Sequence, residues 1–278
     1  MAGVDGPILT DQQLADYKEF GFLHSIPILS SAEVEHYRAE MDRTCAAIGG
    51  CVTRLNGLHL FFQWAWDLCT HPRLLDCLEQ LIGPDILLTS TRVFYKHGRT
   101  SSYVGWHQDG ITQRLEDGRA PAVWLGLTAA TVENGCLRVV PRSHQFGLLH
   151  HESSPDLPPL PDAEKSFDNW PQDELSGRIT EVPPTYDLPF DLVMRAGEMS
   201  IHHPVVLHGS NPNVSPEPRI GLSASYTIPE LYNNQRPVAC ARGSGPTNFR
   251  IDRPPSATFA EAVAAYCADD RQTLYATI

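Results

Sequence analysis

The sequence predicts a mainly β protein with flanking helices, built on a barrel or a double-sheet jelly roll. Downstream of Pro84, short runs rich in β-branched and aromatic residues are separated by Gly, Pro and Asn. Helical patterns are concentrated before that point and at the end of the chain, so helices and strands do not alternate as they do in a βαβ fold. All-β domains often reach a length of 278 residues. We therefore expect one domain, residues 1–278, with a mainly helical support (1–84), a β core (85–230) and a C-terminal extension (231–278).

The composition narrows the class of partner. The formal net charge of −12 argues against binding to nucleic acid or to an anionic membrane. No apolar run reaches the length of a membrane span, and the N-terminus lacks a basic stretch followed by an apolar one. The seven cysteines show no C-x-x-C spacing, so we expect buried free thiols in a reducing compartment. These features predict a soluble, cytoplasmic protein with no obligate protein partner.

Two capping boxes mark helix starts near the N-terminus. They are Thr10-x-x-Gln13 and Ser30-x-x-Glu33. The residues between these two helices, 21–29, are apolar and contain a proline, which predicts an edge strand or an extended link. Residues 51–62 have no clear period. The helix that starts at Ser30 is expected to run to about Ile48. Two further helices are expected on either side of a break at residues 70–72, and the one after the break ends at Gly83-Pro84. A last helix is expected over residues 256–275.

The β core is read from its β-branched and aromatic runs. The predicted strands are 86–95, 122–132, 136–140, 192–194, 199–202, 205–207 and 220–228. A Glu-Asn-Gly turn at 133–135 separates two of them. The segment 152–190 is proline-rich and polar, and long insertions of this kind are usually functional or disordered. We expect it to be an active-site lid or loop, with surface disorder as the alternative.

The motif Trp106-His107-Gln108-Asp109 carries the first chemical signal. In a strand, side chains two residues apart face the same side, so His107 and Asp109 could hold one metal ion together. A lone His-x-Asp is a weak signal in a chain with twelve histidines. His208, at a Gly-Ser turn after an apolar run, is the best third ligand. Two histidines and one carboxylate with open positions are the ligand set of non-haem Fe(II) oxygenases.

Arg219 adds a possible cosubstrate anchor. It lies eleven residues after His208, and the residues between them are almost all turn formers. We expect the strand bearing His208 to reverse there, so that Arg219 opens the next strand alongside it. A guanidinium facing the metal would offer a planar fork for the distal carboxylate of 2-oxoglutarate. Ser210 could donate a further hydrogen bond. The alternative for Arg219 is a surface ion pair with Glu217.

Three motifs together resemble the phytanoyl-CoA dioxygenase family of Fe(II)/2-oxoglutarate oxygenases. They are W-H-Q-D (106–109), V-E-N-G-C-L-R-V-V-P-R-S-H (132–144) and H-G-S-N-P-N-x-S-x-x-x-R (208–219). The resemblance covers roughly residues 10–230. It implies a double-stranded β-helix, the jelly-roll core that is also cupin-like. Arg142 departs from the family, which usually has glycine at that position.

The resemblance also assigns roles to individual residues. It implies that His107, Asp109 and His208 bind Fe(II), and that Arg219 with Ser210 binds 2-oxoglutarate, with O2 as the second cosubstrate. Trp124 matches a tryptophan that lies near the cosubstrate in relatives.

The expected reaction is hydroxylation, or another oxidation of an unactivated C–H bond, in a small molecule of natural-product or secondary metabolism. Succinate and CO2 would be the coproducts. Asp109 argues against halogenation, because halogenases have a small residue there, and the acidic chain argues against an acyl-CoA substrate. The alternatives are a cupin-like enzyme or binding protein that uses its metal without redox chemistry, and an oxygenase-like pseudoenzyme.

The substrate pocket is less clearly marked. Ser90, Arg92 and Phe94 share one face of a predicted strand, and we expect that face to point inward, with Ser90 near the cosubstrate. Arg92 would then favour an anionic or carboxylated substrate; a salt bridge at the barrel rim is the alternative. Further substrate-contacting candidates, each with a structural role as its alternative, are Asn56, His59, Gln113 and His202.

Overall fold

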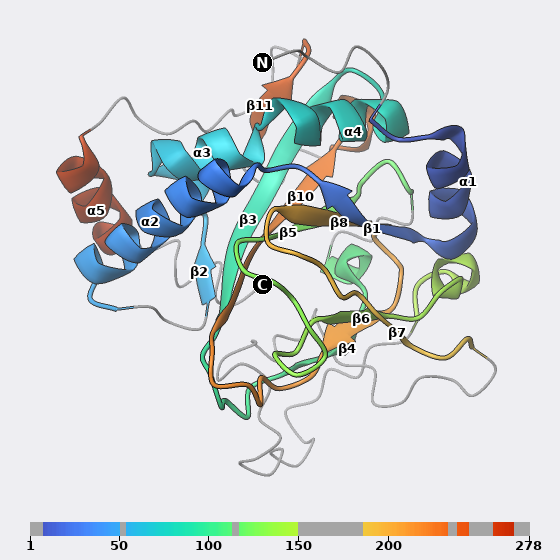
Figure 1. Ribbon diagram of the computed structural model, residues 1–278. Coiled ribbons are helices and arrows are strands. Elements are labelled where there is room, and N and C mark those ends of the chain that lie inside the picture. Colours follow the sequence, from blue (N-terminus) through green and yellow to red (C-terminus); the bar gives the residue numbers. More distant parts are fainter. Residues whose placement is uncertain are drawn as a thin grey trace, which may run out of the picture.

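The computed structural model describes residues 8–50, 54–112, 117–149, 186–232, 238–244 and 258–269. Within them, two antiparallel sheets form the predicted jelly-roll core (Figure 1). The large sheet has the order β1-β8-β5-β10-β3-β11, with β2 also paired to β3. The small sheet has the order β4-β9-β6-β7.

The strands of the large sheet are β1 (Phe22–Pro27), β2 (Arg54–Asn56), β3 (Ile86–Lys96), β5 (Ala122–Gly126), β8 (Glu198–His202), β10 (Arg219–Thr227) and β11 (Ala239–Arg242). Those of the small sheet are β4 (Val104–His107), β6 (Leu137–Val139), β7 (Phe190–Asp191) and β9 (His208–Ser210). The large sheet therefore recruits strands from the N-terminal helical region and from the C-terminal extension.

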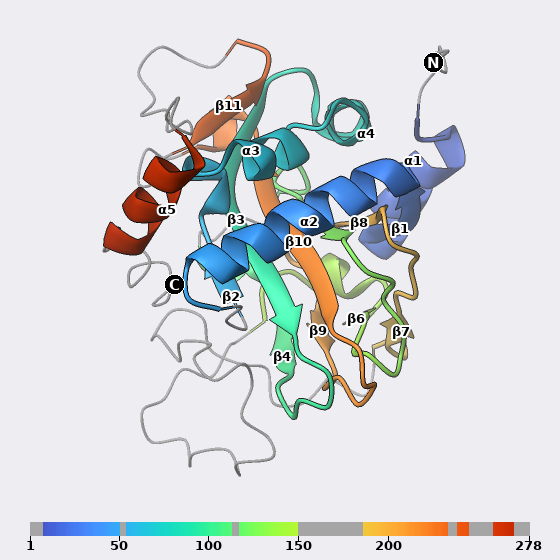
Figure 2. The same ribbon diagram turned by 60° about the vertical axis from the view of Figure 1, so that its left-hand side comes forward.

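The helices form where their capping signals predict them. Helix α1 (Asp11–Phe20) begins at Thr10 and α2 (Ser31–Ala47) begins at Ser30, each with a complete capping box. Helices α3 (Gln63–Cys69) and α4 (Pro72–Ile82) flank the predicted break, and α5 (Phe259–Ala268) lies within the predicted C-terminal helix. Figure 2 shows α2 lying across β3 and β10.

The main hydrophobic core lies between these helices and the outer face of the large sheet. Val93 of β3, with Leu222 and Ala224 of β10, packs there among the buried side chains of the helices. Alternation then turns Arg92 of β3 and Ser223 of β10 to the inner face. The helices thus cover one side of the sheet and leave the other for the site.

Three predicted strands are shorter or shifted. Residues 205–207 are fully buried but form a turn, in which Val206 N–H donates to the His203 carbonyl, and β9 starts only at His208. The strand predicted at 122–132 ends at Gly126, and the one predicted at 192–194 is β7 at 190–191 instead. At residues 205–207 the apolar run reflects burial, which a turn supplies as well as a strand does.

The chain between β9 and β10 also differs from expectation. Strand β10 does not lie alongside β9, because it pairs with β3 and β5 in the large sheet while β9 pairs with β4 and β6 in the small one. The turn-forming residues that join them therefore carry the chain from one sheet to the other. Arg219 and His208 therefore face each other across a cavity from different sheets, instead of lying on neighbouring strands as expected.

The cysteines only partly follow the expectation of buried free thiols. Cys69, Cys77 and Cys136 are free and buried, whereas Cys240 and Cys267 are free but not buried. Cys45 is disulfide-bonded, so the expectation is wrong for this residue. Separately, none of the helices in the described part of the chain is long and apolar enough to cross a membrane.

Candidate active site

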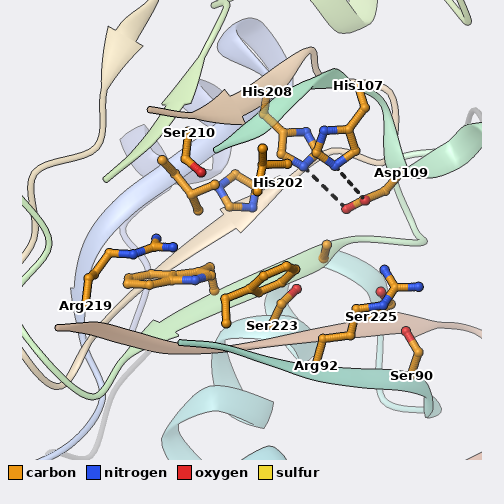
Figure 3. A pocket seen from close by; sticks show the side chains of 15 residues that line it. Ser90, Arg92, His107, Asp109, His202, His208, Ser210, Arg219, Ser223 and Ser225 are labelled. Atoms are coloured by element: carbon orange, nitrogen blue, oxygen red, sulfur yellow. Dashed lines mark ion pairs between the residues drawn. The ribbon is translucent and has the colours of Figure 1, made fainter. Parts of the chain in front are cut away.

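A cavity between the two sheets collects most of the predicted site residues. Its lining from the large sheet includes Arg92, Trp124 and Arg219, and its lining from the small sheet includes His208 and Ser210 (Figure 3). These side chains all point into the one cavity because inward-facing positions alternate along each strand. The jelly roll therefore brings together segments that lie more than a hundred residues apart in the sequence.

His107, Asp109 and His208 form the one cluster in the described residues whose side chains could hold a metal ion. His107 ends β4 and is the direct register partner of His208 at the start of β9. Asp109 follows at the start of a short 3-10 helix (Asp109–Thr112). Its two carboxylate oxygens lie 3.5 Å from His107 Nε2 and 3.7 Å from His208 Nε2. All three ligand atoms lie within 4.8 Å of one another.

Backbone carbonyls fix which nitrogen each histidine presents. The Nδ1 of His107 lies 2.9 Å from the Gly105 carbonyl oxygen, and that of His208 lies 3.0 Å from the Val206 carbonyl oxygen. A carbonyl can only accept, so both Nδ1 atoms carry the proton and donate it. Nε2 is therefore the nitrogen that each histidine presents on the side of Asp109. This is the outer hydrogen bonding that metal-binding histidines usually have.

The electrostatics of Asp109 also suit a metal ligand. Burial by itself would raise the pKa of its carboxyl group, but His208 and His107 outweigh that effect and hold the pKa well below its usual range. Arg92 acts in the same direction. The carboxylate is thus ionised throughout the physiological pH range and available to a cation.

Arg219 lies at one end of the cavity with an unsatisfied guanidinium. The residue is 1% exposed, and its Nε and Nη1 atoms have no hydrogen-bond partner in the part of the chain that the structure describes. The expected alternative, an ion pair with Glu217, is therefore not formed. Burial lowers the pKa of Arg219 to about 10. A buried cation without an anion is costly, which indicates that this position receives a negatively charged group.

Trp124 forms the surface beside this guanidinium. The Arg219 guanidinium carbon lies 5.1 Å from the centre of the indole, within cation–π range. The ring crosses β10 at Gly221, where an added Cβ would lie 2.0 Å from Trp124 Cζ2. Gly221 therefore leaves the room that the indole occupies. Trp124 and Arg219 therefore lie side by side in the wall of the cavity.

The opposite end of the cavity is built from hydroxyl groups and a second guanidinium. Ser90, Arg92 and Phe94 line it, so their face of β3 points inward as expected. In the β3–β10 register, Arg92 lies opposite Ser223, and Ser90 lies opposite Ser225. Figure 3 shows Arg92 and Arg219 at opposite ends of the pocket.

This arrangement changes the expectation for Ser90. Arg219 is paired with Lys96 at the far end of β3, six residues and roughly 20 Å along the strand from Ser90. Ser90 therefore lies with Arg92, at the end away from the guanidinium expected to hold the cosubstrate. The expected contact between Ser90 and the cosubstrate is not supported, because sequence spacing alone does not say which strand residue faces Arg219.

His202 is the most buried of the remaining candidates in the cavity. It is 2% exposed, its ring stacks on that of His208 with centres 5.6 Å apart, and its Nε2 has no hydrogen-bond partner among the described residues. Burial, then the charge of His208, lower the pKa of His202 to about 3. His202 is therefore a neutral imidazole that faces the pocket.

Two of the other substrate candidates, Asn56 and His59, are not among the residues that line the cavity. The Nδ1 atom of His59 lies 2.7 Å from Thr91 Oγ1. Asn56 is paired with Arg92 across β2 and β3, but its side chain is not part of the cavity wall. Gln113 lies outside the described residues, as does most of the segment predicted as a lid, 152–190.

The sequence reasoning missed Ser223 and Ser225. Counting in steps of two from Arg219 along its strand would have found both, because residues 219, 221, 223 and 225 share one face. The sequence also predicted no role for Lys96. That lysine is fully buried and donates to Ser210 Oγ.

The residues in the cavity fit an iron ion together with a dicarboxylate cosubstrate. Two imidazole nitrogens and one carboxylate oxygen form a donor set that leaves coordination positions open for other ligands. In the same cavity the unpartnered Arg219 offers a bidentate fork of the shape that a carboxylate accepts. The two histidines of the cluster come from the small sheet, whereas Arg219 comes from the large one, so the fold brings the two parts of the fit together.

Comparison with known proteins agrees with this chemistry. The chain is 27% identical over 236 residues to an ectoine dioxygenase of Nocardia farcinica, covering 76% of this chain and 75% of the relative. It is 28% identical over 190 residues to an L-proline trans-4-hydroxylase of Streptomyces griseoviridis, covering 63% and 67%. Among solved structures, the non-heme monooxygenase ThoJ in its apo form superposes with a TM-score of 0.74 at 26% identity, covering 95% of this chain and 96% of that one.

The family assignment follows from the sequence profile that matches this chain. The profile described as Phytanoyl-CoA dioxygenase (PhyH) matches residues 63–221, which include all three motifs quoted above and more than half of the chain. The chain therefore belongs to the phytanoyl-CoA dioxygenase (PhyH) family of non-haem iron, 2-oxoglutarate-dependent oxygenases.

Proposed function

We propose that His107, Asp109 and His208 hold Fe(II), and that Arg219 binds the distal carboxylate of 2-oxoglutarate. The observation that carries this proposal is the unpartnered, buried guanidinium of Arg219 in the same cavity as a two-histidine, one-carboxylate cluster. A non-redox metal protein of the cupin kind would need the cluster but not the buried cation. Trp124 covers one side of the cosubstrate position and keeps water from the guanidinium.

The reaction that we propose is oxidation of a C–H bond in a small molecule. Bound iron and 2-oxoglutarate, with O2, supply the oxidising chemistry, and succinate and CO2 leave as coproducts. The chain contributes ligand geometry, cosubstrate orientation and a pocket buried between two sheets. Relatives named for ectoine and L-proline support a small-molecule substrate. Asp109 favours hydroxylation or a related oxidation over halogenation, because its carboxylate occupies the position that a halide would need.

The far end of the cavity suggests how the substrate is held. Arg92 and the hydroxyl groups of Ser90, Ser223 and Ser225 present hydrogen-bond donors around one small volume. A guanidinium with several hydroxyl groups suits a carboxylate or another anionic group. We propose that the substrate carries such a group, with Phe94 against its apolar part.

The iron and cosubstrate assignment is tested by anaerobic addition of Fe(II) and 2-oxoglutarate to the purified protein. We expect a weak visible charge-transfer band, and release of succinate once O2 is admitted. His208→Ala should remove both signals, whereas His36→Ala, which replaces an exposed histidine on α2, should leave them unchanged. A metal-loaded wild-type protein without the band would contradict the proposal and favour non-redox metal chemistry.

The substrate assignment is tested by a screen of small carboxylated and uncharged compounds, with succinate release as the measurement. Arg92→Met should raise the KM for an accepted anionic substrate while leaving the affinity for 2-oxoglutarate within about threefold of the wild type, because Arg92 is far from Arg219. Equal loss of affinity for both molecules would argue that Arg92 serves the whole site, for example as a counter-charge to Asp109.

A further inference from the structure

Lys96 ends the row of inward-facing side chains on β3. Ser90, Arg92 and Phe94 line the cavity, and Lys96 is the next residue of the same parity. It lies directly opposite Arg219 in the β3–β10 register, so both side chains leave the same face of the large sheet. Lys96 itself is 0% exposed. A second basic side chain is thus buried immediately behind the predicted cosubstrate end of the cavity.

The contacts of Lys96 point to a specific task. Its Nζ donates to Ser210 Oγ at 2.8 Å, to the Gly135 carbonyl oxygen at 3.4 Å and to the Asn211 carbonyl oxygen. Among the described residues, these three acceptors equal in number the N–H donors of an ammonium group. Burial, then the charge of Arg219, lower the pKa of Lys96 to about 5, so the charged form is costly here. An anion bound at Arg219 would offset that cost.

The bond to Ser210 determines what that hydroxyl group can do. A serine hydroxyl has one proton and two lone pairs. When Lys96 donates to one lone pair, the proton of Ser210 must be directed to a different acceptor. Ser210 lines the cavity together with Arg219, and it extends from the small sheet toward the large one.

We propose that Lys96 is a positioning residue that turns the Ser210 hydroxyl proton toward the distal carboxylate of 2-oxoglutarate. This inference rests on the proposed function, because it assumes that Arg219 receives that carboxylate. It adds that recognition of the carboxylate uses a hydrogen-bond donor that Ser210 supplies and that Lys96 holds in place. The cosubstrate end is then selective for a dicarboxylic 2-oxo acid over one without the distal carboxylate.

A purely structural role is the competing explanation. Lys96 also joins the turn that contains Gly135 to the crossover between β9 and β10, and its carbonyl oxygen accepts from Asn213 Nδ2. A structural lysine would change stability, and it would change the binding of all 2-oxo acids alike. A positioning residue would change the preference for the distal carboxylate.

The experiment compares Lys96→Met, Ser210→Ala and the double variant, with Lys18→Met, an exposed lysine on α1, as the matched control. Each protein is loaded with Fe(II) without oxygen. It is then titrated with 2-oxoglutarate and, separately, with 2-oxovalerate, which lacks the distal carboxylate. The absorbance of the charge-transfer band gives both dissociation constants.

We expect each single variant to weaken 2-oxoglutarate binding roughly tenfold or more, since a hydrogen bond to a charged group is lost. The double variant should bind 2-oxoglutarate no more weakly than the single variant that has the lower affinity, because both residues act through one hydroxyl group. Binding of 2-oxovalerate should stay within about threefold of the wild type, and Lys18→Met should match the wild type. Multiplicative losses in the double variant, or equal losses for both 2-oxo acids, would overturn the inference.

Two further comparisons keep the test decisive. If Lys96→Met does not fold, Lys96→Gln keeps an N–H donor for the buried carbonyl groups but lacks the charge and the reach to Ser210, and the same loss of preference is expected. A wild-type protein that shows no band with either 2-oxo acid would contradict the proposed function itself. A normal wild-type band with unchanged preference in the lysine variant would contradict only the role of Lys96.

Discussion

Replacing Arg219 by methionine should have opposite effects on cosubstrate binding and on stability. In the wild type, Nε and Nη1 of the guanidinium are buried and lack partners among the described residues, so a bound carboxylate would supply an acceptor that these residues do not. Removing one partner of a buried, hydrogen-bonded charge pair costs about 2–5 kcal/mol. At about 1.4 kcal/mol for each factor of ten, the affinity for 2-oxoglutarate should fall by roughly 30-fold to several thousand-fold.

The free protein should not suffer from the same substitution. Replacing buried charges by well-packed apolar side chains is often neutral, or stabilising by about 1–4 kcal/mol. Methionine is flexible enough to fill the space beside Trp124. For a chain of this length, a change of 1 kcal/mol shifts Tm by about 2–4 °C, so we expect an unchanged or slightly raised Tm in Arg219→Met.

The assay combines anaerobic titration of the Fe(II)-loaded protein with thermal unfolding of the free protein. Arg119→Met, which removes an exposed and ion-paired arginine, is the matched control. In the wild type, 2-oxoglutarate should bind far more tightly than 2-oxovalerate, and the ratio should approach one in Arg219→Met. If Arg219→Met binds 2-oxoglutarate within about threefold of the wild type, or if its Tm clearly falls, Arg219 is not an unpaired cation that binds the distal carboxylate.

Three further predictions concern the metal cluster, the indole and acid stability. Asp109→Ala should weaken Fe(II) binding, measured by equilibrium dialysis, by about tenfold to a hundredfold or more, because changes to residues outside the metal ligands already cost that much. Unchanged binding would show that Asp109 is not a ligand. Gly221→Ala places a Cβ against Trp124 and should lower the free energy of unfolding by about 1–3 kcal/mol, as measured by denaturant unfolding. It should also weaken 2-oxoglutarate binding, as measured by titration. Wild-type values in both assays would contradict the close contact. Burial and the charge of His144 lower the pKa of His203 to about 4. As the pH falls, His203 is therefore protonated near pH 6.5 in the unfolded chain but only near pH 4 in the folded protein. Stability should therefore fall as the pH drops from about 6.5 to 4, and less steeply in His203→Gln; an equal slope in both proteins would contradict this cause.

Much of the architecture was readable from local patterns. The capping boxes at Thr10 and Ser30 specify their helices because a cap is a hydrogen-bonding arrangement among residues three positions apart. The long strands β3 and β10 were likewise recognisable from their β-branched and aromatic character. Residues 205–207 show where such reasoning fails, since an apolar run reports burial and does not distinguish a strand from a buried turn.

The sequence alone predicts the chemistry of the site, because the cluster residues and Arg219 lie in two of the three motifs, at 106–109 and 208–219. The fold was needed to show that β10 joins the large sheet, so that Arg219 faces His208 across a cavity. It also decided that Ser90 lies at the end away from Arg219, and that Lys96 stands behind Ser210. The physical reason is that strand pairing and register are set by contacts between distant segments, whereas a motif records only what each segment carries.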